Sequence, residues 1–170
     1  MEGPVDHIGG GKDNYRFDVA VGVVTLLTIG HKLLVVVRSI HIQASIVLQT
    51  RWVGAEDIRT DGEPFIVYFS PRHEVDQGDV VYDVSIPVKD DPDETDRIRV
   101  VDMIENKVLA GTHYGSTDNI MDTYAKLVEI AQKNHYDIIG SPKEVLIKGF
   151  YNCDNEDEYI TEIQLPIIEM

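Results

Sequence analysis

The stretch GEPFIVYF at residues 62–69 returns later in the chain as GSPKEVLI at residues 140–147. Each copy is Gly-x-Pro followed by a run of residues typical of a β-strand. A polar turn comes next in both copies, and then a second strand that ends in a proline, at Pro87 and at Pro166. The copies are 78 positions apart at their glycines and 79 at these closing prolines. Because the two copies agree both in spacing and in the positions of their glycines and prolines, we infer that the chain contains an internal repeat.

The repeat extends upstream of both Gly-x-Pro stretches. Residues 23–26 and 31–35 (VVTL and HKLLV) resemble residues 100–103 and 106–110 (VVDM and NKVLA). Each half is therefore predicted to open with strands and to reach its Gly-x-Pro through a crossover segment.

In the second half this crossover is predicted to be a helix. Apolar residues recur from Ile120 to Ala131 with the period of an α-helix, and we expect this stripe to be core. Asp118 is placed to cap the N-terminus, and Lys133 to complement the helix dipole near the C-terminus. The stripe consists of Ile120, Met121, Tyr124, Leu127, Val128 and Ala131.

The first crossover, residues 40–61, gives a weaker pattern. Ile42, Ile46 and Val53 keep a helical spacing, but the run SIVL at residues 45–48 suits a strand equally well. Counted between equivalent positions, this segment is also three residues shorter than its partner. We expect a short helix here, with a distorted or partly lost helix as the alternative.

Together these segments predict an α+β fold of two βαββ repeats with an antiparallel sheet. We expect repeat one at residues 19–89 and repeat two at residues 99–168, related by pseudo-twofold symmetry. Neither half would bury its sheet face alone, so residues 15–170 are predicted to be one domain with a central ligand cleft. Residues 1–14, which hold four glycines and a proline, are predicted to be a flexible tail, either native or added to the protein.

The composition excludes several classes of partner. The chain has 30 acidic and 15 basic residues, a formal net charge of -15. Nucleic acids and anionic membrane surfaces are unfavourable partners, since both are bound through basic patches. No membrane-spanning helix is predicted, because His31 and Lys32 interrupt the most apolar stretch, residues 19–37. The N-terminus does not have the pattern of a signal peptide, so we expect a cytoplasmic protein.

Cysteine and histidine usage gives no sign of a cofactor. Cys153 is the only cysteine, so no internal disulfide is expected, and the six histidines lack metal-ligand spacing. The acidic turns at residues 90–94 and 154–158 lack the spacing of an EF-hand loop. We therefore expect neither a metal nor a cofactor.

The second half resembles a known family. Its motifs are KVLAGTHYG at residues 107–115, DTYAKL at 122–127, Gly140-x-Pro142-x-Glu144-Val145, and EIQLPI at 162–167. In this order and spacing they are similar to the GyrI-like small-molecule-binding domain. The same domain is the effector-binding module of BmrR-type and AraC-type multidrug-responsive regulators. The resemblance covers about residues 19–168 and is strongest from Lys107 onward.

The resemblance implies two βαββ repeats around a central cleft, in agreement with the internal repeat. Members bind lipophilic, often cationic, aromatic compounds, and the pocket glutamate after the second helix falls here on Glu144. Some members resemble hydrolases of cyclopropane-containing toxins, and others inhibit gyrase. The first half departs from the family pattern, because Arg38-Ser39-Ile40 replaces the turn glycine found as Gly115. No DNA-binding helix–turn–helix precedes the domain, so a complete transcription factor is not expected.

Glu144 is the central candidate for the ligand site. In its strand, alternation puts Glu144 and Leu146 on one face and Val145 and Ile147 on the other. If the second pair meets the helix, Glu144 faces the cleft, where a carboxylate among aromatic side chains attracts a lipophilic cation. The alternative is a solvated glutamate on an open sheet face. If the protein is an enzyme, Glu144 is its expected catalytic base.

Aromatic and apolar residues of both halves complete the predicted ligand site. Ile66 and Tyr68 occupy the positions of repeat one that are equivalent to Glu144 and Leu146. Aromatic faces attract cations, although sheet packing is the alternative role for each tyrosine. The predicted ligand-binding residues are Glu144, Leu146, Tyr68, Ile66, Tyr114, Tyr159, Tyr151 and Trp52.

Three hypotheses for function follow. The first is a stand-alone binding protein for lipophilic, cationic aromatic compounds. The second is a hydrolase that uses Glu144 and a tyrosine to add water to a strained electrophile in the same cleft. The third is a protein-interaction role, such as gyrase inhibition, through the acidic surface. A protein partner or a homodimer is compatible with each.

Overall fold

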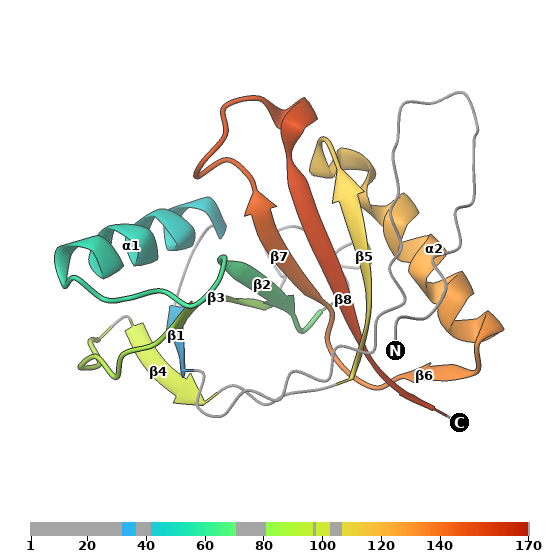
Figure 1. Ribbon diagram of the computed structural model, residues 1–170, viewed down its shortest axis with the longest axis horizontal. Helices are drawn as coiled ribbons and strands as arrows, with labels where there is room; N and C mark the ends of the chain where they lie inside the picture. Colours follow the sequence, from blue (N-terminus) through green and yellow to red (C-terminus); the bar gives the residue numbers. More distant parts are fainter. Residues whose placement is uncertain (1–31, 37–41, 71–80, 97, 103–106, 170) are drawn as a thin grey trace, which may run out of the picture. The chain divides into compact units, whose positions relative to one another are not determined.

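The computed structural model describes residues 32–36, 42–70, 81–96, 98–102 and 107–169. They form two compact units: a first unit within residues 32–102 and a second unit within residues 107–169. Each unit combines antiparallel strands with one α-helix (Figure 1). The α+β fold class is thereby confirmed. The predicted tail, residues 1–14, and the early strand at residues 23–26 lie outside the described residues.

The first unit, as described, consists of four strands and the helix α1. The elements are β1 (Lys32–Val36), α1 (Ile42–Ala55), β2 (Phe65–Tyr68), β3 (Tyr82–Val88) and β4 (Ile98–Asp102). The strands lie in the order β4-β1-β3-β2 and pair antiparallel throughout. Val53 of α1 packs against Ile86, Val88 and Ile98, and this cluster is the core of the unit. Gln49 of α1 donates from Nε2 to the carbonyl of Val84 at 2.8 Å.

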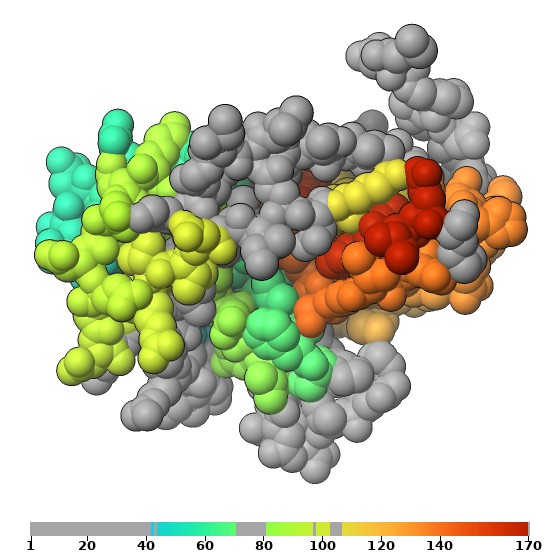
Figure 2. Space-filling model, turned by 90° about the horizontal axis from the view of Figure 1, so that it is seen from below, coloured from blue at the N-terminus to red at the C-terminus, as the bar shows by residue number. Residues whose placement is uncertain are grey.

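The second unit is built around its longest strand. The elements are β5 (Val108–Tyr114), η1 (Thr117–Asn119), α2 (Ile120–Lys133), β6 (Tyr136–Ile138), β7 (Lys143–Lys148), η2 (Glu156–Glu158) and β8 (Ile160–Glu169). β8 pairs antiparallel with β5, β7 and β6. Figure 2 shows β5, β8 and β7 side by side, in yellow, red and orange. The core between α2 and this sheet consists of Leu109, Ile120, Leu127, Ala131, Ile163, Leu165 and Ile167.

The two units use the same internal pairing. β3 lies between β1 and β2, as β8 lies between β5 and β7. In the first unit Leu33 is opposite Pro87, and in the second unit Val108 is opposite Pro166. These four residues stand at equivalent positions of the sequence repeat, so the strand registers of the two units agree.

The Gly-x-Pro motifs have a packing role in both units. A Cβ added to Gly62 would lie 3.3 Å from the Cγ of Pro87, and one added to Gly140 would lie 3.5 Å from the Cγ of Pro166. Each glycine therefore lies against the closing proline of its own unit. This contact explains why the glycine and the closing proline keep their spacing within each copy.

The helix α1 is longer than the sequence suggested. It has 14 residues, the same number as α2, and the two helices begin 78 positions apart. The expectation of a short or distorted first helix was therefore wrong, and the missing residues of this crossover lie ahead of the helix. Asp57 and His135, also 78 positions apart, follow the two helices with φ of 52° and 59°. This left-handed conformation is a common way to end a helix.

The start and the outer face of α2 differ from the prediction. Asp118 lies in η1 and does not cap α2; Ser116 caps η1 instead, where its side chain accepts from the backbone N–H of Asp118. Met121 and Val128 are 39% and 37% exposed, so they lie outside the core. An apolar pattern such as that from Ile120 to Ala131 cannot locate a helix start when a 3₁₀ turn precedes it. The strand β6 was not predicted at all.

Candidate functional site

Glu144 lies on the sheet face that α2 covers. It is opposite Ile163 in the β7–β8 register, and Ile163 belongs to the core beneath α2. Directly opposed residues of antiparallel strands share a face. Val145 and Ile147 therefore lie on the other face, and Ile147 is 39% exposed. The orientation assumed in the sequence analysis, with these two residues against the helix, is not the one observed.

The carboxylate of Glu144 is buried and hydrogen-bonded. Its residue is 2% exposed, which contradicts the alternative of a solvated glutamate on an open sheet face. The hydroxyl of Tyr124, on α2, donates to Oε1 of Glu144 at 2.9 Å. Removing a carboxylate from water is costly unless such partners satisfy it. The pair therefore places a buried polar contact between α2 and β7.

Thr123, the neighbour of Tyr124 on α2, makes the matching contact with β5. Its hydroxyl lies 2.9 Å from Nδ1 of His113, and Nε2 of His113 lies 2.9 Å from the carbonyl of Ser116. Because a carbonyl only accepts, Nε2 carries a proton, and in the neutral ring Nδ1 accepts from Thr123. Adjacent residues of α2 thus hold β5 and β7, the strands on either side of β8.

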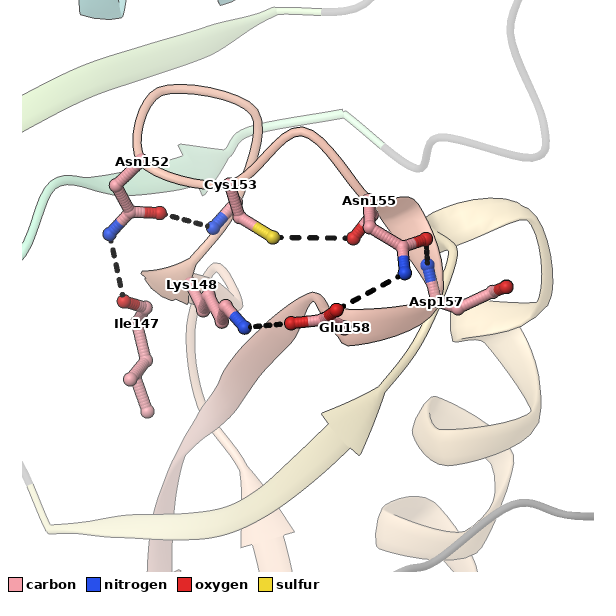
Figure 3. Close-up of polar contacts among 8 residues, drawn as sticks. Ile147, Lys148, Asn152, Cys153, Asn155, Asp157 and Glu158 are labelled. Carbon is pink, nitrogen blue, oxygen red and sulfur yellow. Dashed lines mark hydrogen bonds and ion pairs between the residues drawn. The ribbon is translucent and has the colours of Figure 1, made fainter.

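Leu146 lies beside Glu144, and a structured loop follows it. Leu146 is buried, and the hydroxyl of Tyr151 donates to its carbonyl at 2.6 Å. Lys148, the last residue of β7, pairs with Glu158 of η2, as Figure 3 shows. The hydrogen bond to Glu158 raises the pKa of Lys148, and the hydrogen bond from Lys148 lowers the pKa of Glu158. These contacts fix the C-terminal end of β7.

The loop between β7 and β8 also holds its own backbone. The side chain of Asn152 accepts from the N–H of Gly149 at 2.8 Å and donates to the carbonyl of Ile147 at 3.3 Å. The thiol of Cys153 donates to the carbonyl of Asn155 at 3.3 Å, and the side chain of Asn155 contacts Asp157 and Glu158 (Figure 3). The acidic turn is therefore a hydrogen-bonded structure.

The two other tyrosines of the second unit are placed differently. Tyr114 ends β5 opposite Ile160. Alternation from Leu109, which is buried beneath α2, puts Tyr114 on the opposite face from Glu144. Tyr159 precedes β8 and is half-buried; burial, and then the negative charge of Glu156, raises the pKa of its phenol. Glu144 and Leu146 thus share a face, Tyr151 is tied to the backbone of Leu146, and Tyr114 lies on the opposite face from Glu144.

The predicted site residues of the first unit lie on the α1 side of its sheet. Ile66 and Tyr68 are both 4% exposed, and Ile66 is opposite Val84, the residue whose carbonyl Gln49 contacts. The ring of Tyr68 lies 6.4 Å from that of Tyr82. Within its unit, this strand thus presents the same face to its helix as β7 does.

Trp52 is half-buried on α1 and packs against the core of the first unit. It also borders an open hollow of about 900 Å³, whose wall is mostly acidic. Arg59 forms an ion pair with Asp90 there, and the hydrogen bond from Arg59 lowers the pKa of Asp90. A hollow with this polar wall differs from the apolar lining that lipophilic compounds prefer. The side chains that line it are Trp52, Glu56, Asp57, Ile58, Arg59, Asp90, Asp91, Pro92, Asp93, Glu94 and Thr95.

Sequence reasoning found Glu144 but missed its partners. Tyr124 was assigned to the apolar stripe, and Thr123 and His113 were left without a role. The available signal was the pair of polar-tipped residues at successive positions of α2, facing a buried strand. Within the described ranges, no group of three metal-ligating side chains is found. None of the helices described is long and apolar enough to cross a membrane.

Comparison with known proteins gives a family model and several structures. The model of the GyrI-like small molecule binding domain matches residues 29–168. The structure is similar to EcmrR in its complex with DNA (TM-score 0.69, 18% identity), covering 92% of this chain and 58% of that one. The EcmrR C-terminal domain gives a TM-score of 0.66 at 18% identity, with 93% and 100% covered.

A hydrolase encoded by lin2189 from Listeria innocua is also similar, with a TM-score of 0.61 at 12% identity. The match covers 81% of this chain and 87% of the hydrolase. At these identities the likeness is one of fold, and the chain spans little more than half of the EcmrR chain. No curated protein matches the sequence.

Proposed function

The chain belongs to the GyrI-like small molecule binding domain family, which confirms the resemblance, and from this premise we propose that it binds lipophilic, cationic aromatic compounds. One observation carries the proposal: Glu144 is buried beneath α2, with its carboxylate held by the hydroxyl of Tyr124 at 2.9 Å. A carboxylate in this setting has few competing waters, so it attracts a cation more strongly than an exposed one does.

The surroundings of Glu144 suit the rest of such a ligand. Leu146 lies next to it on the same face, and Ile163 lies opposite it in the core. The ring of Tyr124 supplies an aromatic surface, and a cation over such a ring gains about 0.5–2 kcal/mol. A ligand that combines a positive charge with a planar apolar body would use both properties of this face.

The other predicted ligand-binding residues remain part of the proposal. Tyr151 and Tyr159 belong to the segment that joins β7 to β8, and Tyr151 is tied to Leu146. Ile66, Tyr68 and Trp52 are the proposed contributions of the first unit. Tyr114 is the weakest member of the set, because it lies on the other face of its sheet from Glu144.

We also propose that the units are two repeats of one βαββ pattern. The equal strand registers, the glycine–proline contacts and the equal helix lengths support this. The pseudo-twofold relation and the central cleft are parts of the same proposal.

Calorimetric titration with a cationic dye, rhodamine 6G, and a neutral dye of similar shape tests the function. Glu144→Gln keeps the shape and hydrogen bonding but removes the charge. We expect the cationic dye to lose about 1–3 kcal/mol, a 5- to 150-fold rise in Kd, and the neutral dye to lose less. Glu129→Gln, on the exposed side of α2, is the matched control and should leave both affinities unchanged. Equal affinities for Glu144→Gln and the unmodified chain would remove Glu144 from the site.

A hydrolase is the second candidate function, and the same contact favours it. A carboxylate with a phenol in hydrogen-bonding reach provides a base and an acid. Glu144 would take a proton from water as the water oxygen bonds to a carbon of a strained ring. As the strained ring bond breaks, the carbon released from it would take the proton of the Tyr124 hydroxyl. Glu144 would then return a proton to Tyr124. The net reaction adds one water.

Turnover separates the two candidates. With a cyclopropane-containing electrophile as the substrate, Glu144→Gln should lower kcat far more than it raises Kd if the protein is a hydrolase. Tight binding of the same compound without any ring-opened product would reject the hydrolase and leave the binding protein.

A further inference from the structure

The face of the second unit's sheet that lies away from α2 brings together an amine, a carboxylate and an amide. Lys143 directly precedes Glu144 in β7, so alternation puts its side chain on the opposite face from Glu144. Lys143 is opposite Gln164 of β8, and Val145 is opposite Glu162. Opposed and diagonal side chains of neighbouring strands are within reach of one another. We call Lys143, Glu162 and Gln164 the outer-face cluster.

The contacts of the cluster orient its carboxylate and favour a neutral amine. Nε2 of Gln164 donates to Oε1 of Glu162 at 2.5 Å. All three side chains are half-buried, so the cluster is neither closed to small molecules nor fully hydrated. Burial lowers the pKa of the Lys143 ammonium, and the negative charge of Glu162 acts against this. At a given pH more of Lys143 is therefore the neutral amine, the nucleophilic form, than of an exposed lysine.

We propose that Lys143 forms an imine with neutral, apolar aldehydes and that Glu162 moves the protons of the reaction. Nζ of Lys143 attacks the carbonyl carbon, and the electron pair of the C=O π bond moves to the oxygen. Glu162 carries the two protons of the nitrogen, one after the other, to that oxygen, which leaves as water. A C=N bond replaces the C=O bond, so amine and aldehyde give imine and one water without any oxidant or reductant.

The neighbours of the cluster determine the class of aldehyde. Val145 follows on the same face of β7, Ala110 is opposite Gln164, and Val108 is opposite Pro166. These side chains offer an apolar surface next to the amine. The carboxylate of Glu162, in a chain with a net charge of -15, repels anionic aldehydes. Neutral aldehydes with an apolar body therefore fit this face best.

Reductive trapping of benzaldehyde on the full chain tests the proposal. Cyanoborohydride reduces an imine to a stable secondary amine, and peptide mass spectrometry then locates the benzyl group. Lys133, an exposed lysine in the last turn of α2, is the internal control. A positioned general base contributes about a hundredfold or more, so we expect Lys143 to be labelled at least about tenfold faster than Lys133. Equal rates at the two lysines would overturn the proposal, and this comparison needs no variant.

Glu162→Gln separates proton transfer from an effect of charge alone. Without the carboxylate the pKa of Lys143 loses the contribution that raises it, so the share of neutral amine should increase. If Glu162 carries the protons, labelling of Lys143 should nevertheless fall by about tenfold or more, with labelling of Lys133 unchanged. Unchanged or faster labelling of Lys143 would overturn the role of Glu162. Since benzaldehyde is neutral and the cluster lies on the other face from Glu144, these outcomes are independent of the proposed cation binding.

Discussion

Two neighbouring side chains of α2 reach polar partners on the strands beneath it. Thr123 contacts His113 on β5, and Tyr124 contacts Glu144 on β7. All four residues place a polar group at the helix–sheet interface, so each of the two contacts supplies a hydrogen-bond partner to a group that is largely removed from water. The ligand proposed for Glu144 would therefore bind at a position that also fixes the helix.

Thr123→Val should destabilise the protein by about 1–3 kcal/mol. The substitution keeps the shape of the side chain but leaves Nδ1 of buried His113 without its partner. Thr112→Val, on the other face of β5, is the control and should change stability by less than about 0.5 kcal/mol. Urea unfolding of both variants measures this. Equal midpoints would show that the Thr123–His113 contact contributes nothing.

Asp83 should make stability depend on pH in the opposite sense to a paired carboxylate. It lies half-buried in β3 opposite Val67, and burial raises the pKa of its carboxyl. The folded protein then binds the proton more tightly than the unfolded chain, so the ionised form costs stability above the folded pKa. The cost disappears as the pH falls through that value.

Asp83→Asn should therefore stabilise the protein at about pH 7 by a few tenths to about 1 kcal/mol. The gain should shrink as the pH is lowered. Asp137→Asn, at an exposed position of β6, should change stability little at any pH. Chemical unfolding across a pH series gives the comparison. A gain for Asp83→Asn that stays constant with pH would mean that charge burial is not its cause.

At the scale of elements, α2 lies so close to β5 that one position allows no side chain. A Cβ added to Gly111 would lie 2.9 Å from Cδ2 of Leu127, closer than carbon atoms approach without movement. Leu127 is fully buried, so it has little room to yield. The closeness of helix and sheet thus depends on a glycine facing a leucine.

Gly111→Ala should cost about 1–3 kcal/mol in the unmodified chain and much less in a Leu127→Ala background. Leu127→Ala alone should cost about 2–5 kcal/mol through the cavity it leaves. A double-mutant cycle of unfolding free energies measures the coupling. Additive costs would show that the two positions do not meet.

The two helices end at residues in the left-handed conformation, Asp57 and His135. Glycine adopts this conformation without the strain of a side chain, so His135→Gly should be neutral or should stabilise by up to about 1 kcal/mol. Lys133→Gly, inside the last turn of α2, should instead destabilise by about 1 kcal/mol. Thermal unfolding distinguishes the two, and a loss for His135→Gly as large as that for Lys133→Gly would contradict the assignment.

Much of the element order could be predicted, because it depends on local pattern. The Gly-x-Pro stretches gave β2 and β7, and the stripe from Ile120 to Ala131 gave α2. The run SIVL at residues 45–48 hid α1, because β-branched residues obscure a helical period. β6 was missed because three residues are too few to carry an alternation.

The site could be predicted only in part. Alternation correctly grouped Glu144 with Leu146, but it cannot say which face of a strand meets the helix. That choice depends on the β7–β8 register and on the packing of α2, which are tertiary properties. Tyr124 was hidden for the same reason, since a tyrosine in an apolar stripe is indistinguishable from core until its hydroxyl finds Glu144.

At the scale of the whole chain, the glycines and closing prolines that mark the repeat have a packing role. Glycines that lie against closing prolines, and strands in the same register, occur in both units. The units differ in chemistry at equivalent positions, with Ile66 where the other has Glu144. Only the second unit therefore carries the carboxylate, and binding of a cation is proposed to depend on that one residue.

The central claim is that a cationic dye binds on the sheet face that carries Glu144. Intermolecular nuclear Overhauser effects between rhodamine 6G and the methyl groups of the protein test this claim most directly. Leu146 and Ile147 are adjacent in β7 and lie on opposite faces. We expect effects from the dye to the Leu146 methyls and the Tyr124 ring, lost in Glu144→Gln at the same concentrations, and none to Ile147. Effects to Ile147 without Leu146, unchanged in Glu144→Gln, would place the dye on the other face and contradict the proposed site.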